Sequence, residues 1–214
     1  MTGEQTQSAR IENLVTSGTF SLDGGTWEVD NNVWIVGDDS EVIVIDPAHD
    51  PAAVAAAVGG RTTRAILLTH GHDDHIRAAR ETADLLGAPL YLHPADRMLW
   101  DAVYDEAPDA QIADGDVHIV AGVELTAKHT PGHSPGSVCF VAPALNAVFT
   151  GDTLFQGGPG ATGRSYSSFE TIIDSIRETL LTLPAETVVH TGHGGTTTIG
   201  TEAPHLQEWI DRGH

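Results

Sequence analysis

Three histidines and two aspartates lie within the six residues from His70 to His75, in the segment LTHGHDDHI. Imidazole nitrogens and carboxylate oxygens are the ligands that zinc, iron and manganese accept in proteins. His70 and His72 are two residues apart, so at a strand end they can project to the same side. Asp74 and His75 follow, where the chain turns into a helix. Ligand vectors from so short a segment diverge too much for one ion, and the spacing predicts two adjacent metal ions.

Further candidate ligands occur later in the chain, each after an expected strand and beside glycine. HTPGHSPGS contains His133, VFTGD contains Asp152, and VVHTGHGG contains His193. Small flanking residues allow the backbone to approach a crowded centre closely. Each of these residues alone would be an ordinary loop residue, so the prediction depends on the whole ordered set.

Alternating strand and helix patterns must position these loops. Apolar, β-branched runs predict strands at 27–37, 41–47, 64–70, 89–93, 117–120, 122–129, 137–142, 147–152 and 187–190. Asn31–Asn32 and Gly37–Asp39 are interpreted as turn signals within the first of these runs and after it. Helical spacing and end signals predict helices at 51–58, 75–87, 93–105, 169–183 and 202–213. Sheets covered by outer helices would bury such strands, so the expected class is α/β or α+β with a layered core.

Composition limits the function classes. The 214 residues carry a formal charge of −20, which disfavours nucleic acid and anionic membranes as partners and can serve to hold cations. The expected partner is a small-molecule substrate. Cys139 is the only cysteine, so an internal disulfide is excluded. The polar N-terminus has no signal-peptide pattern, and no apolar run approaches the roughly 20 residues of a membrane span. We therefore expect a cytoplasmic protein with a flexible segment at 1–10 and one domain at 11–214. Its oligomeric state is left open.

THGHDDH, HTPGHSPGS, GDTLF and GHGG, in this order over residues 26 to 200, resemble the metallo-β-lactamase superfamily, specifically its hydroxyacylglutathione hydrolase (glyoxalase II)-like branch. The resemblance implies a single-domain, α+β fold, the four-layer αββα sandwich with metals at one edge. It implies two divalent metal ions, with zinc favoured over iron or manganese. The implied ligands of the first metal are His70, His72 and His133, and those of the second are Asp74, His75 and His193. Asp152 would bridge the two ions.

The resemblance also implies a chemistry and two auxiliary roles. A water bound between two metals becomes a hydroxide near neutral pH and attacks the substrate carbonyl, so no nucleophilic Ser or Cys is needed. Asp74 could orient that water or relay its proton, which makes it the candidate catalytic residue. Asp46 would lie behind the metal loops and hold a ligand in place. Relatives usually have Gly after this Asp-Pro, whereas here Ala48 and His49 follow, which leaves the shape of that loop open.

The sequence gives less information about substrate contacts. Arg164, just after the glycine-rich loop 157–163, is the basic residue most suited to bind a substrate anion, and Tyr166 and Arg77 are weaker candidates. We expect the loop itself to be mobile, Asp73 to be a solvated spacer and Trp27 to serve packing. Glutathione-specific relatives carry a C-terminal helical domain, and we expect none here. The thiol could therefore be glutathione, mycothiol or another small thiol.

The leading hypothesis is a metallo-hydrolase that cleaves a thioester of a small thiol. A β-lactamase is disfavoured because those enzymes typically lack the bridging aspartate that Asp152 would provide. The main alternative is a mononuclear iron persulfide dioxygenase of the same fold, whose ligands would be His70, His133 and Asp152. Lactone or ester hydrolysis, and a metal-binding role without catalysis, are further alternatives that turnover assays would separate.

Overall fold

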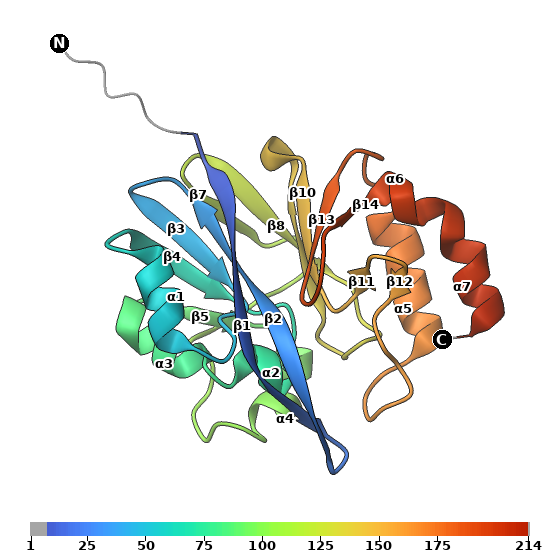
Figure 1. The fold of residues 1–214 in the computed structure, drawn as a ribbon, viewed down its shortest axis with the longest axis horizontal. Helices are drawn as coiled ribbons and strands as arrows, with labels where there is room; N and C mark the ends of the chain where they lie inside the picture. The colour runs from blue at the N-terminus through green and yellow to red at the C-terminus, as the bar shows by residue number, and fades with distance from the viewer. Residues whose placement is uncertain (1–7, 214) are drawn as a thin grey trace.

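The computed structural model describes residues 8–213, and Figure 1 shows two sheets packed together with helices on their outer faces. The first sheet has the strand order β1-β2-β3-β4-β5-β6 and the second has the order β14-β13-β10-β9-β8-β7. The strands of the first sheet are β1 Arg10–Leu22, β2 Gly25–Gly37, β3 Glu41–Ile45, β4 Thr62–Leu67, β5 Leu90–Leu92 and β6 Ala110–Gln111. Those of the second are β7 Val117–Val120, β8 Val123–His129, β9 Val138–Ala142, β10 Ala147–Gly151, β13 Val188–Thr191 and β14 Thr197–Thr198.

The remaining elements are short. A separate ribbon pairs β11 Leu154–Phe155 with β12 Gly158–Pro159. The α-helices are α1 Pro51–Val58, α2 Asp73–Ile76, α3 Ala79–Leu86, α4 Arg97–Trp100, α5 Phe169–Ser175, α6 Ile199–Glu202 and α7 Leu206–Arg212. A π-helical turn, Ile176–Leu180, extends α5. Among residues 8–213, no helix combines the length and apolar character that a membrane crossing needs.

Three buried clusters explain the four layers. Val33 and Ile35 of β2 pack with Val54 of α1 beneath the outer helices of the first sheet. Their strand neighbour Trp34 points the other way and packs with Phe149 of β10 between the two sheets. A third cluster joins the outer face of the second sheet to α5 and α7. Strands buried on both faces have continuous apolar sequences, which is why these runs were recognisable. The predicted αββα sandwich is confirmed.

Shared strand direction brings the polar loops to one edge. β3 and β4 run parallel, and so do β10 and β13. β8 and β10 are both antiparallel to β9, so they also run in the same direction. The carboxyl ends of β4, β8, β10 and β13 precede the loops that carry the candidate ligands. Loops at the carboxyl ends of such strands are where ligands bind in layered α/β folds.

The structure corrects four expectations from the sequence. β1 was not predicted: it is a 13-residue strand that forms a hairpin with β2, and the hairpin turns at Asp23 and Gly24, both at positive φ. Asn31 and Asn32 are not turn residues: they lie buried within β2. The helix expected over 75–87 is interrupted between α2 and α3, where the Tyr104 hydroxyl lies within hydrogen-bond distance of the Ile76 and Arg77 carbonyls. The helix expected over 93–105 is shortened to a 3-10 turn, Pro94–Asp96, and α4.

Of the segment 1–10, which we expected to be flexible, residues 1–7 lie outside the described residues. Its last residue, Arg10, begins β1.

Candidate metal centre

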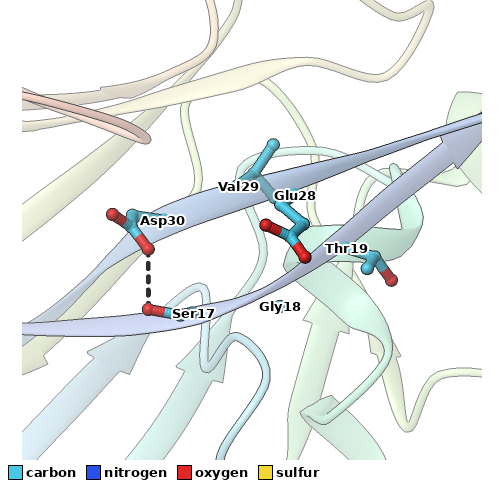
Figure 2. Close-up of a pocket in the computed structure, with 6 residues that line it drawn as sticks. All are labelled: Ser17, Gly18, Thr19, Glu28, Val29 and Asp30. Carbon is cyan, nitrogen blue, oxygen red and sulfur yellow. Dashed lines mark hydrogen bonds between the residues drawn. The ribbon is translucent and has the colours of Figure 1, made fainter.

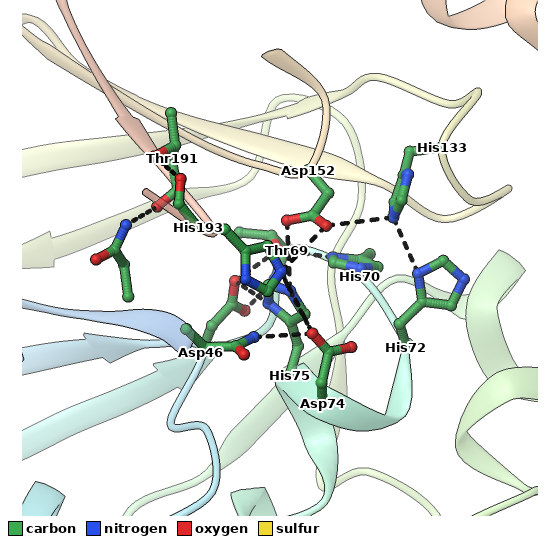
Figure 3. A network of polar contacts seen from close by, with 12 residues as sticks. Asp46, Thr69, His70, His72, Asp74, His75, His133, Asp152, Thr191 and His193 are labelled. Atoms are coloured by element: carbon green, nitrogen blue, oxygen red, sulfur yellow. Dashed lines mark hydrogen bonds and ion pairs between the residues drawn. The ribbon is translucent and has the colours of Figure 1, made fainter. Parts of the chain in front are cut away.

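The structure brings all seven candidate ligands into one buried cluster between the two sheets (Figure 3). His70, His72 and His133 offer ligand atoms within 4.8 Å of one another, and we call them the histidine triad. Asp74, His75 and His193 form a second such group, here called the mixed triad. Together with Asp152 they draw on four separate strand-end loops and on α2. The local spacing of 70–75 therefore places ligands in both triads.

Asp152 lies between the two triads. Its Oδ2 is 3.5 Å from Nε2 of His133 and 3.4 Å from Nε2 of His193. Its Oδ1 is 3.4 Å from Nε2 of His75. One carboxylate thus faces a member of the histidine triad with one oxygen and members of the mixed triad with both. This is the position that a bridging ligand requires.

Hydrogen bonds fix the orientation of four imidazole rings. Nδ1 of His133 donates to the Ala161 carbonyl (2.9 Å), and Nδ1 of His193 donates to the Asp30 carbonyl (2.7 Å). Carbonyl oxygens only accept, so Nδ1 of each ring carries the proton. In the neutral rings the lone pair is then on Nε2, which faces the cluster.

Asp46 orients the other two rings. It accepts hydrogen bonds from the Thr69 amide (2.7 Å), the Thr69 hydroxyl (2.6 Å) and Nδ1 of His75 (3.0 Å). Because the Thr69 hydroxyl donates to Asp46, its oxygen accepts from Nδ1 of His70, at 3.0 Å. His70 and His75 therefore also direct Nε2 inward. Bonds of this kind are typical of metal-ligating histidines, whose other nitrogen is bound to a carboxylate or a carbonyl.

Buried polar atoms without a hydrogen-bond partner test whether the cluster suits a metal. Nε2 of His70 and Oδ1 of Asp152, which both face the cluster, are buried with no hydrogen-bond partner among residues 8–213. A buried polar atom without a partner is unfavourable and rare in native proteins. Nδ1 of His72 lies 2.9 Å from Nε2 of His133, so this ring presents its Nδ1 to the centre. The donor set of imidazoles and carboxylates fits divalent zinc, iron or manganese.

The two triads differ in their electrostatics. Burial lowers the pKa of His70 well below its usual value, and burial with the nearby His133 lowers the pKa of His72 to about 3. In the mixed triad, burial opposes protonation, but the carboxylates outweigh it. Asp74 and Asp152 raise the pKa of His75 well above its usual value, and Asp152 raises the pKa of His193 to about 10.

The same ion pairs keep the carboxylates charged. Burial acts to raise the pKa of Asp74, yet His75 and the hydrogen bonds from His193 and Asn31 lower it to about 2.

Comparison with known proteins agrees with this arrangement. Residues 26–193 match the sequence family described as the metallo-beta-lactamase superfamily. The chain belongs to that superfamily. It is 36% identical to the probable metallo-hydrolase YqgX of Bacillus subtilis, over 80% of this chain and 88% of that protein. It is 32% identical to the hydroxyacylglutathione hydrolase GloC of Haemophilus influenzae, over 77% of this chain and 85% of that protein.

Two solved structures are similar to this chain over nearly their whole length. The BLEG-1 B3 metallo-beta-lactamase matches with a TM-score of 0.77 and 30% identity, over 89% of this chain and 98% of that one. TTHA1623, solved in a di-iron-bound form, matches with a TM-score of 0.73 and 32% identity, over 88% and 96%. The fold thus holds two metals in at least one similar protein.

A cavity of about 250 Å³ opens over the cluster and is lined by apolar side chains on one part and by five of the candidate ligands on another. Phe20 and Trp27 reach it from opposite strands of the β1–β2 hairpin, and the Phe20 ring centroid lies 5.3 Å from that of His72. Arg164 lines the same cavity, with its guanidinium 4.0 Å from the Trp27 ring centroid. Asp23 at the hairpin tip accepts hydrogen bonds from the amide and hydroxyl of Ser165. The hairpin and the loop after β12 therefore form the entrance together.

A larger groove of about 580 Å³ lies along the hairpin itself (Figure 2). Its lining includes Ser17, Gly18, Glu28 and Asp30, and Ser17 donates to Asp30 at 2.6 Å. It contains carboxylates but none of the grouped metal-ligating residues. The chemistry therefore places the candidate site in the smaller cavity above the metal ligands.

Other candidate residues lie elsewhere. Arg77 pairs with Asp73 and lines a surface cavity beside His49, so it does not reach the cluster. Tyr166 is 58% exposed and does not line the cavity over the triads. Asp73 also accepts from the Ser21 amide, so it holds β1 and is not merely a solvated spacer.

Sequence reasoning missed two supports. Asp96 is fully buried and accepts from the amides of Gly71 (2.7 Å) and Gly136 (2.5 Å) and the hydroxyl of Ser134 (2.6 Å). It therefore ties the loop of His70 to the loop of His133. The second support is Asn31, whose side chain donates to Asp74 at 2.9 Å.

Proposed function

We propose that this protein is a metal-dependent hydrolase that cleaves a thioester of a small thiol, with two divalent ions held by the two triads and Asp152. The observation that carries the proposal is the orientation of the rings of His70, His75, His133 and His193: each binds a protein oxygen through Nδ1 and directs Nε2 to the centre. Zinc is the first choice of metal, and iron or manganese would also suit these ligands.

Two bound ions would polarise a carbonyl and lower the pKa of a shared water to near neutrality. The protein's own residues supply the rest. Asp74 lies beside Asp152 and His193 at the cavity floor, where its carboxylate can orient a water molecule and accept its proton. Asp46 keeps His70 and His75 in the required orientation, directly and through Thr69.

Among the described residues, Cys139 and Ser134 are unsuited to act as the nucleophile. Burial raises the pKa of the Cys139 thiol to about 11, so it is neither charged nor accessible at neutral pH. The Ser134 hydroxyl donates to buried Asp96. A hydrolytic mechanism that uses an activated water is therefore the one that these residues support.

The entrance favours a small substrate. Phe20, Trp27, Val29 and Ala161 supply apolar walls, and Arg164 is the basic residue among those that line the cavity. A guanidinium at this position suits a carboxylate on the acyl or the thiol part. Glutathione, mycothiol and other small thiols all remain candidates. The similarity to GloC supports a thioester, and that to BLEG-1 makes a β-lactam a necessary comparison substrate.

The test has two stages. Plasma mass spectrometry of the untagged protein should give about two metals per chain, and thioesters of small thiols should then release thiol at a rate that falls on chelation and recovers with added metal. One iron per chain with oxygen uptake on a persulfide would instead support the dioxygenase. Acid release from lactones alone, or β-lactam opening alone, would reassign the substrate. Bound metal without turnover of any of these would reject the enzyme assignment.

A further inference from the structure

Two further side chains, Asn31 and His49, form a hydrogen-bonded chain that ends on Asp74. Asn31 of β2 is fully buried, and its amide nitrogen donates to Oδ2 of Asp74 at 2.9 Å. This bond fixes the orientation of the amide, because a carboxylate accepts only from the NH₂ end. The Asn31 carbonyl oxygen must then face the opposite way, toward His49.

His49 completes the chain. Its Nε2 lies 2.8 Å from Oδ1 of Asn31, and since that oxygen accepts, Nε2 carries the proton and donates. A single orientation of the Asn31 amide therefore satisfies both its bond to Asp74 and its bond to His49. His49 reaches this position from the loop after β3, next to Ala48, whose carbonyl accepts from the Thr16 hydroxyl at 2.8 Å.

The backbone is shaped to hold His49 there. His49 has a φ of 58°, a left-handed conformation that is uncommon for a residue other than glycine. Its ring lies against Gly18 of β1, where an added Cβ would be 2.1 Å from Nδ1. Such conformations persist when surrounding contacts determine them, and they concentrate at functional sites. The lack of a side chain at Gly18 therefore leaves the space that the His49 ring occupies.

We propose that Asn31 and His49 are a positioning pair that holds the Asp74 carboxylate in the orientation needed by the mixed triad. Asn31 donates to Oδ2, the oxygen that also faces His75 and His193, and so limits rotation of the carboxylate. His49 prevents the amide from turning its oxygen toward Asp74. The inference rests on the proposed role of Asp74 as a metal ligand, but metal binding itself can test it without a known substrate.

The experiment measures binding of two equivalents of Co²⁺ to metal-free protein, by chelator competition and by the visible d–d spectrum. His49→Ala should weaken the equivalent bound at the mixed triad about 10- to 100-fold and change its spectrum, with little change for the histidine triad. Gly18→Ala should do the same, because its Cβ displaces the His49 ring. His49→Gln, which retains an N–H donor, should recover part of the affinity.

A double variant separates positioning from a general structural effect. Gly18→Ala combined with His49→Ala should be no worse than either alone, since both remove the same contact. Asn31→Ala should match or exceed them. The control is His118→Ala, a half-buried histidine of β7 that packs on Tyr91 and should leave both equivalents unchanged.

Unchanged affinity and spectrum for the mixed triad in folded His49→Ala and Gly18→Ala proteins would overturn the inference. If Asn31→Ala fails to fold, these two variants still decide the matter. A wild-type protein that binds two Co²⁺ ions but turns over no substrate would refute the proposed function and leave this test intact.

Discussion

The two triads share one carboxylate and one cavity floor, yet they hold their protons differently. In the histidine triad, burial disfavours charge, so His70 and His72 are neutral at pH 7. In the mixed triad, Asp74 and Asp152 make protonated His75 and His193 the stable forms. His70 and His72 can therefore bind a cation without first losing a proton. In the metal-free mixed triad, His75 and His193 form ion pairs with the carboxylates, and a metal must replace these ion pairs.

The largest expected effect comes from breaking the element that the triads share. Asp152→Ala removes the carboxylate that faces His133 as well as His75 and His193. We expect the affinity for both metals to fall and kcat/KM to decrease by about 10³-fold or more. Metal content and turnover measure this, with Asp84→Ala, at an exposed position of α3, as the control. Wild-type affinity at either triad would show that Asp152 belongs to the other alone.

Proton release distinguishes the triads directly. Filling the mixed triad at pH 7 should release about two protons, from His75 and His193, and filling the histidine triad should release none from His70 and His72. At lower pH, protons compete more strongly with the metal for His75 and His193. The metal affinity of the mixed triad should therefore fall up to about 100-fold per pH unit between pH 8 and pH 6. Calorimetry in two buffers of different ionisation enthalpy counts the protons. Equal release at both steps would contradict the ion-pair description.

A third change should affect only the histidine triad. Asp96→Asn keeps the volume but replaces an acceptor by an amide that cannot accept from Gly71, Gly136 and Ser134 together. We expect about 10- to 100-fold weaker metal binding at the histidine triad and little change at the mixed triad. Asp109→Asn is the matched control, since that carboxylate also accepts a backbone N–H, from Leu90, outside both triads. Equal weakening at both triads would mean that Asp96 supports the fold rather than one metal.

Features formed by residues close together in the sequence could be predicted, whereas features formed by distant residues could not. The ligands of 70–75 are adjacent in sequence, and strands buried on both faces have continuous apolar runs, so the cluster and the sandwich were recognisable. Asp96 gave no such signal, because its partners Gly71 and Gly136 are 25 and 40 residues away. Asn31 was misinterpreted as a turn residue because its partner, Asp74, is brought close only when β2 packs beside α2.

The hairpin was missed for a related reason. β1 is an edge strand whose residues are mostly half-buried, so it lacks the clean alternation of a strand with one buried face. The β1–β2 pair nevertheless brings Phe20 and Trp27 to the entrance. Substrate contacts are therefore the least predictable part of the site, since they depend on how a hairpin and a distant loop meet.

The smallest effect should leave both triads unchanged. Arg164 is placed at the entrance by the Trp27 ring and by the contacts of Ser165 with Asp23, and it belongs to neither triad. Arg164→Gln should therefore raise KM about 10-fold for a thioester that carries a carboxylate and leave kcat and both metal affinities unaltered. For an uncharged thioester the KM should rise much less. The control Arg177→Gln, on the exposed side of the π-helical turn, should change neither KM nor kcat. A fall in kcat with KM constant would place Arg164 in the reaction itself, and equal losses for charged and uncharged substrates would assign it to packing of the entrance.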